Sequence, residues 1–189
     1  MKRPLCFLPV ITVALLGGGS LPLASAETVC YQGGADRGEI RFHFRIERST
    51  FTGGFTSFRV EYCMEAGKPD QGDISVTVDL TSVATGNRDL NIGIQEPEAL
   101  DVDNYPSAEW RTRSIERDGS DFLVTGELTI RGVSRPEQGR FQLDGENGGW
   151  RLTGSSRIRR LDYQVGIGEF ADTDFIPDDV LVEFDLGLR

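Results

Sequence analysis

Alternation of apolar and polar residues is the feature that most constrains the fold of this chain. Between residues 40 and 47, isoleucine or phenylalanine occupies every second position, and charged residues or the single histidine fill the others. The same period returns in residues 58–62 and 73–80. A side-chain period of two is typical of a β-strand that buries one face, so these three segments are predicted to be strands.

Further strands are predicted at residues 108–115, 122–130, 138–143, 150–161 and 179–186, with glycine-containing turns between many of them. No segment shows the sustained i, i+3, i+4, i+7 apolar stripe of a long amphipathic helix, although the connection 87–103 is predicted to hold a helical turn. The chain is therefore predicted to be all-β, with about eight or nine antiparallel strands. An up-and-down barrel removes the exposed strand edges by closure, while a two-sheet β-sandwich fits the periodicity almost equally well.

Residues 1–26 are predicted to be a cleavable signal peptide. Lys2 and Arg3 precede an apolar stretch at residues 5–16, and Ala24-Ser25-Ala26 supplies small residues for cleavage. The stretch is short for a transmembrane helix, and it is interrupted by Pro9 and followed by three glycines. The mature chain, residues 27–189, is expected to form a single domain that is periplasmic or secreted.

The charge and the cysteines of the mature chain narrow its partners and compartment. Loss of Lys2 and Arg3 from 20 basic residues, against 30 acidic residues, leaves a net charge of about −12. Such a charge repels nucleic acid and anionic membrane surfaces. Cys30 and Cys63 remain, and two cysteines in an oxidising compartment predict one disulfide, with two free buried thiols as the alternative.

Catalytic and metal-binding patterns find little support. His43 lies between Phe42 and Phe44 and is expected on the opposite face of the strand, exposed or packed rather than catalytic. The chain contains no G-x-S-x-G, H-E-x-x-H, P-loop or C-x-x-C spacing. The acidic groups at 172–179 and 101–104 lack the pattern of a calcium loop. We predict a protein that is not an enzyme, with no catalytic residue, metal site or cofactor.

Five segments occur in the order of one known family. They are 51–58 (FTGGFTSF), 74–89 (ISVTVDLTSVATGNRD), 100–110 (LDVDNYPSAEW), 126–136 (GELTIRGVSRP) and 160–163 (RLDY). Together they resemble the YceI-like family of bacterial secreted lipid-binding proteins, with 51–58 resembling a glycine turn followed by G-x-F-x-x-F. The chain departs from the family at 46–49, where K-H-x-G is absent, and at Gln164, which replaces a glycine.

The resemblance implies an eight-stranded, lipocalin-like barrel whose apolar tunnel holds a polyisoprenoid chain, such as an isoprenoid quinone of the ubiquinone type. A protein of this family is expected to carry or sequester its lipid without catalysis, to meet membranes only transiently and to form a homodimer. The alternative is a stress-related interaction module whose barrel is packed solid and binds no ligand.

The inward residues of the predicted strands are the candidates for the tunnel wall, although an ordinary filled core would use the same residues. These candidates are Phe42, Phe44, Phe55, Phe58, Val60, Val76, Val78, Leu128, Ile130 and Phe141. The family motifs also contain Arg88 with Asp89, and Arg160 with Asp162. These four residues are predicted either to fix loop geometry at the barrel ends or to contact a ligand headgroup at the mouth.

Overall fold

The computed structural model describes residues 27–146 and 148–189, so the predicted signal peptide lies outside the described residues. Eleven strands form one antiparallel sheet. The strands are β1 (Thr28–Gly34), β2 (Gly38–Ile46), β3 (Ser49–Phe55), β4 (Phe58–Glu65), β5 (Lys68–Asp79), β6 (Val83–Ala84), β7 (Ser107–Asp118), β8 (Asp121–Ile130), β9 (Val133–Glu146), β10 (Gly149–Arg159) and β11 (Asp179–Leu188). The helix α1 spans Arg88–Gln95, and three short 3₁₀ helices span Leu80–Ser82, Arg160–Tyr163 and Gly168–Ala171.

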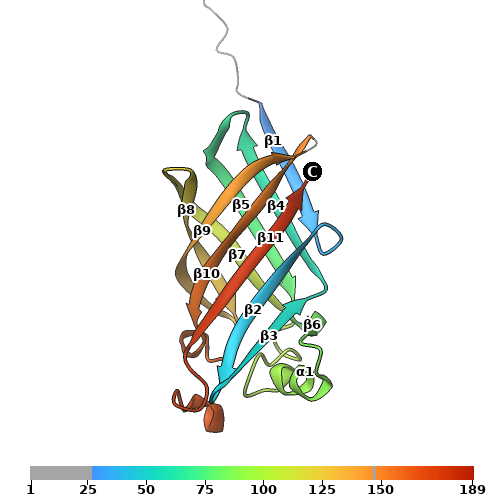
Figure 1. Cartoon of the computed structure of the whole chain (residues 1–189), viewed down its shortest axis with the longest axis vertical. Helices are drawn as coiled ribbons and strands as arrows, with labels where there is room; N and C mark the ends of the chain where they lie inside the picture. The colour runs from blue at the N-terminus through green and yellow to red at the C-terminus, as the bar shows by residue number, and fades with distance from the viewer. Residues whose placement is uncertain (1–26, 147) are drawn as a thin grey trace, which may run out of the picture.

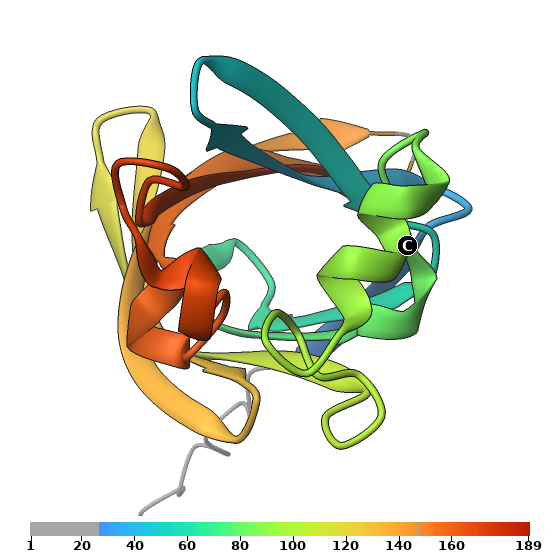
Figure 2. The same ribbon diagram turned by 90° about the horizontal axis from the view of Figure 1, so that it is seen from below.

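The sheet curls into a lipocalin-like barrel (Figures 1 and 2). Its strand order is β1-β4-β5-β7-β8-β9-β10-β11-β2-β3-β6. The edge strand β1 meets the end of β11, where Gln32 and Arg189 exchange two backbone hydrogen bonds of 2.7 and 2.9 Å. This contact joins β1 to the strand that faces it across the opening of the sheet. It gives hydrogen-bond partners to backbone groups of an edge strand that would otherwise be unpaired. The barrel prediction is confirmed, and the two-sheet alternative is wrong because all eleven strands belong to one sheet.

The predicted alternation is present in the strands. In β4, for example, Phe58, Val60, Tyr62 and Met64 are buried while the residues between them are partly or fully exposed. The strand count is higher than predicted because β1, β3 and β6 were not recognised. Gly53 and Gly54, which the sequence suggested as a turn, lie inside β3 and pair with Phe42 and Arg41 of β2.

The hairpin between β8 and β9 is closed by the two residues Arg131 and Gly132. Their φ angles are +50° and +72°, the left-handed conformation that a tight two-residue hairpin requires at both positions. Pro136, which lacks the N–H that a strand ladder uses, lies within β9 opposite Glu127. The pairing of β9 with β10 begins only at Gly139, so β9 has a free side near Pro136, as a residue without an N–H requires.

The two ends of the barrel differ in how they are filled. The end that carries the β4–β5, β7–β8 and β9–β10 turns, here called the closed end, is packed with side chains. Tyr62 and Val60 are fully buried there, and Leu188, Phe141 and Phe122 are at most 3% exposed. The opposite end, here called the mouth, carries the connection 80–106 with α1 and the segment 160–178. Figure 2, seen from the mouth, shows these two segments on opposite sides of the barrel.

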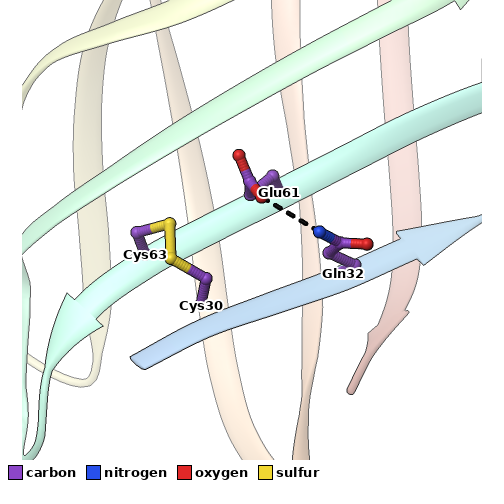
Figure 3. Close-up of a disulfide and its surroundings, with 4 residues drawn as sticks. All are labelled: Cys30, Gln32, Glu61 and Cys63. Carbon is purple, nitrogen blue, oxygen red and sulfur yellow. Dashed lines mark hydrogen bonds between the residues drawn. A yellow bond between two sulfur atoms is a disulfide. The ribbon is translucent and has the colours of Figure 1, made fainter. Parts of the chain in front are cut away.

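The predicted disulfide joins β1 to β4 on the outer surface of the barrel (Figure 3). Cys30 and Cys63 are directly opposite each other in the strand register, with their Cα atoms 3.9 Å apart. Two pairs further along, on the same face, Gln32 donates a side-chain hydrogen bond of 3.0 Å to Glu61. The disulfide therefore links the edge strand β1 to its neighbour β4 and does not enter the barrel interior.

Candidate functional site: an apolar cavity in the barrel

A cavity of about 440 Å³ occupies the mouth half of the barrel. Its wall consists almost entirely of apolar side chains from the inner faces of β2, β3, β5 and β7 to β11, completed by the connection 80–106 with α1 and by the segment 160–178. Among the residues that line it, Asp89 and Gly93 of α1 are the exposed ones. The cavity therefore reaches the protein surface beside α1, and a slender apolar ligand has room inside it.

The helix α1 forms one side of the mouth. It begins after Asn87, whose side-chain oxygen accepts hydrogen bonds from the backbone N–H groups of Asp89 and Leu90 at 2.9 and 3.1 Å, as an N-cap does. Leu90 and Ile94, one turn apart, are half-buried and line the cavity. Ile92 points away from this face and is 48% exposed. The short helix is thus held in place by its cap and by two apolar contacts.

Eight of the ten predicted wall residues line the cavity. They are Phe42, Phe44, Phe55, Val76, Val78, Leu128, Ile130 and Phe141. Phe58 and Val60 do not line it, and both are buried in the hydrophobic core with Tyr62 and Ile74. The inner face of β4 belongs to the packed part of the interior, so for these two residues the structure shows a filled core rather than a tunnel wall.

Glycines beneath aromatic rings keep the cavity wide. A Cβ at Gly53 would lie 2.8 Å from Cε1 and Cε2 of Phe42, and one at Gly126 would lie 2.6 Å from Cε2 of Trp110. At Gly154 the nearest ring atom would be Cε2 of Phe184, at 2.7 Å. All three rings line the cavity. Because each ring approaches a glycine of a neighbouring strand more closely than a Cβ would permit, it lies against the sheet and adds apolar surface to the wall.

Arg160 is buried in the wall and holds the segment 160–178 together. Its five N–H groups donate to the backbone carbonyls of Pro177, Val165, Gly166, Phe170 and Ile176, at distances from 2.6 to 3.2 Å. The residue is 5% exposed, and burial lowers the pKa of its guanidinium. All the donors of an arginine are thereby used. In this arrangement Arg160 fixes the geometry of the segment 160–178, and it has no N–H group left over for a headgroup.

The other three predicted mouth residues are separated by the fold. Asp89 lines the cavity, whereas Arg88 and Asp162 are exposed and do not. Gln164, which replaces the family glycine, adopts the left-handed conformation with φ of 59°. Its backbone N–H closes the preceding 3₁₀ helix on the carbonyls of Arg160 and Leu161. The departure from the family pattern therefore leaves the turn itself intact.

Arg131 is a mouth residue that the sequence interpretation missed. Its Nη1 donates to the carbonyls of Ala99 and Gln164 at 2.6 and 2.7 Å. Its Nη2 lies 3.8 Å from Asp101, in a pair whose side chains are 8% and 11% exposed. Arg131 lies one residue beyond the predicted strand 122–130. Gly132, next to it, was the sequence signal that Arg131 lies in a turn. From this turn Arg131 links the two sides of the mouth.

Three further polar side chains of the wall, those of Tyr163, Ser156 and Glu109, have partners within the protein. The Tyr163 hydroxyl donates to Glu137 at 2.8 Å, and burial together with this bond raises the pKa of the phenol. The Ser156 hydroxyl donates to the Gln138 carbonyl at 2.7 Å. Glu109 contributes to the wall from β7, but its carboxylate lies 3.4 Å from Arg111 on the outer face. The interior thus offers apolar contact and few free polar groups.

Groups suited to catalysis or metal binding lie outside the cavity. His43 is on the outer face, where its ring nitrogens contact Thr52 Oγ1 at 3.0 Å and Glu183 Oε2 at 2.7 Å. In residues 27–146 and 148–189, the one group with metal-ligand spacing is Cys30, Glu61 and Cys63. Its two sulfur atoms are joined in the disulfide. This group is therefore explained by the covalent bond.

Comparison with known families identifies the fold and its relatives. The model of the YceI-like domain matches residues 31–188. The chain belongs to the YceI-like family. This YceI-like protein is 25% identical over 137 residues to Protein YceI of Escherichia coli O17:K52:H18, an alignment that covers 67% of this chain and 72% of that protein. A UPF0312 protein of Photorhabdus laumondii is 21% identical over 136 residues, with 66% and 71% covered.

Solved structures share the YceI-like fold. BcnA of Burkholderia cenocepacia superposes with a TM-score of 0.78 at 24% identity, covering 82% of this chain and 98% of BcnA. A polyisoprenoid binding domain from Saccharophagus degradans superposes with a TM-score of 0.65 at 16% identity, covering 86% and 99%. At these identities the likeness shows the fold. Among the residues described in this YceI-like protein, no helix has the length and apolar character to cross a membrane.

Proposed function

We propose that this protein binds a polyisoprenoid lipid, of the isoprenoid quinone type, and carries or sequesters it without chemical change. The cavity of about 440 Å³ with its apolar wall is the observation that carries the proposal. Transfer of hydrocarbon from water to such a wall is favourable by about 0.8 kcal/mol per CH₂ group, so a chain of several isoprene units has a large incentive to enter.

Reversible carriage fits this energetics better than permanent storage. A polyisoprenoid normally resides in a bilayer, which is as apolar as the cavity, so its transfer between the two is nearly balanced. The family supports the same function, since the neighbour from Saccharophagus degradans is described as a polyisoprenoid binding domain. The solid-core alternative has no comparable support, because side chains leave the mouth half of the barrel unfilled.

The proposed place of action is the periplasm or the extracellular space. The signal peptide predicted for residues 1–26 and the disulfide between Cys30 and Cys63 are the two observations in its favour. Mass analysis of the protein from fractionated cells tests this proposal. A mature chain that starts at Glu27 in the exported fraction is expected, and a full-length chain in the cytoplasmic fraction would contradict it. Light scattering of the same material tests the expected homodimer.

Native mass spectrometry tests the bound lipid. Protein purified from cells without harsh delipidation is expected to carry a hydrophobic molecule whose mass fits a polyisoprenoid. Val76→Phe should reduce its occupancy, because Val76 lines the cavity. The matched control is Thr77→Phe, one residue further along β5, where the side chain is exposed on the outer face. Protein that is consistently empty and also ignores added ubiquinone would refute lipid binding.

A further inference from the structure

The closed end determines where the headgroup of a bound lipid lies. Packed side chains fill that end, with Phe141 2% and Leu188 1% exposed. A chain therefore enters tail first, and its polar headgroup stays where the cavity reaches the surface, beside Asp89 and Gly93. The groups at the mouth consequently decide which headgroups are accepted.

A phosphate or diphosphate headgroup needs several hydrogen-bond donors or cations, and the arginine and hydroxyl groups of the wall do not supply them. Arg160, the one arginine that lines the cavity, donates all five N–H groups to backbone carbonyls. The hydroxyls of Tyr163 and Ser156 donate to Glu137 and to a backbone carbonyl. Each of these side-chain donors is therefore already used within the protein.

The charge around the mouth is strongly negative. The connection 80–106 contains five acidic residues and one basic residue, and the segment 160–178 has the same composition. The two basic residues are Arg88, exposed on α1 and outside the wall, and the saturated Arg160. The strands and turns at the mouth add four cations: Arg131 paired with Asp101, Arg159 paired with Asp178, and Arg45 and Arg48 beside Glu47. The ten acidic residues of the two segments still outnumber the basic ones. A dianionic headgroup beside Asp89 would meet net repulsion.

We infer that the cavity accepts lipids with an uncharged headgroup, such as a quinone or an alcohol, and discriminates against prenyl phosphates and diphosphates. This inference rests on the proposed function and specifies the lipid class of the same site. A neutral headgroup needs no cation, and a carbonyl or hydroxyl at the mouth remains in contact with water.

Two ligands with the same tail test the inference: geranylgeraniol and geranylgeranyl diphosphate. Binding is measured by displacement of a fluorescent apolar probe and by quenching of Trp110, whose ring lines the cavity. The alcohol is expected to bind at least about tenfold more tightly than the diphosphate at low ionic strength. This ratio of the two affinities should shrink as salt screens the repulsion between the diphosphate and the mouth.

Two variants with equal change in net charge separate the mouth from the protein as a whole. Asp89→Lys should improve the affinity for the diphosphate and leave the affinity for the alcohol nearly unchanged. The ratio of the two affinities should therefore fall severalfold. Glu116→Lys is the matched control, because Glu116 is exposed on β7 towards the closed end. Asp89→Asn, which keeps the shape of the side chain, should give an intermediate ratio.

The outcomes separate the inference from the proposed function. Equal affinity for the two ligands would overturn the inference and leave lipid binding intact. An equal change of the affinity ratio in Asp89→Lys and Glu116→Lys would also overturn the inference, because the effect would then come from the total charge of the protein. Binding of neither ligand by the folded wild-type protein would refute the proposed function itself.

Discussion

Gly53→Ala is predicted to narrow the cavity by displacing the ring of Phe42. The added methyl group would lie 2.8 Å from two ring carbons of Phe42, where ordinary contact begins at 3.4 Å. The ring is also in contact with Phe55, with centroids 5.3 Å apart. Since the backbone of β3 lies beneath the ring, the remaining direction of movement is into the lumen.

The size of the effect follows from these distances. The two ring carbons must retreat by at least 0.6 Å, which swings the ring edge over space that a ligand would use. Overpacking of this kind costs about 1–3 kcal/mol of folding stability. If the ring excludes about two CH₂ groups of ligand, about 1.6 kcal/mol of binding is lost, or about a 15-fold increase in Kd.

A double-mutant cycle on polyisoprenols of increasing length is the assay. Gly53→Ala should weaken binding about 15-fold, and Phe42→Leu should make the same glycine substitution nearly neutral because it removes the ring. Thermal unfolding of each variant checks that the protein remains folded. Unchanged affinity in folded Gly53→Ala protein, or the same loss in the Phe42→Leu background, would refute the role of the glycine beneath the ring.

Three further predictions concern stability. Replacing both Cys30 and Cys63 with Ser should lower the free energy of unfolding by about 3–4 kcal/mol, and a reductant should do the same to the wild type in urea titrations. Arg160→Lys leaves at least two of five carbonyl acceptors without a donor and should cost about 3 kcal/mol or more. Proteolysis is then expected within 164–178, and an uncut segment would contradict the role of Arg160. The raised pKa of Tyr163 stabilises the fold fully below its ordinary value of 10.0 and progressively less as pH rises towards the folded-state pKa. Urea titrations between about pH 9 and about pH 11 should therefore show falling stability in the wild type and a smaller fall in Tyr163→Phe.

Much of the barrel could be predicted from the sequence because its strands bury one face each. Period-two alternation identified the strands that contain Phe42, Val76 and Leu128, and it also identified which of their side chains point inwards. The same rule failed for β3, where Gly53 has no side chain to show the alternation. The predicted strand 138–143 also stops short of Pro136, which β9 can include because β10 does not pair with that part of β9.

The packed and open parts of the interior could not be separated in this way. Val60 and Val76 are register partners on β4 and β5 with the same expected facing, yet one is fully buried in the core and the other lines the cavity. The role of Arg160 depends on carbonyls up to 17 residues away along the chain, which local pattern does not reveal.

The position of Arg131 makes the two sides of the mouth mechanically dependent on each other. One guanidinium binds Ala99 in the connection that follows α1 and Gln164 in the opposite segment, and it is anchored on a two-residue hairpin with little freedom. A displacement that a ligand causes on one side is therefore transmitted to the other. Hydrogen exchange should accordingly slow in both segments together when a lipid is bound, and the Arg131→Ala variant should make their responses independent.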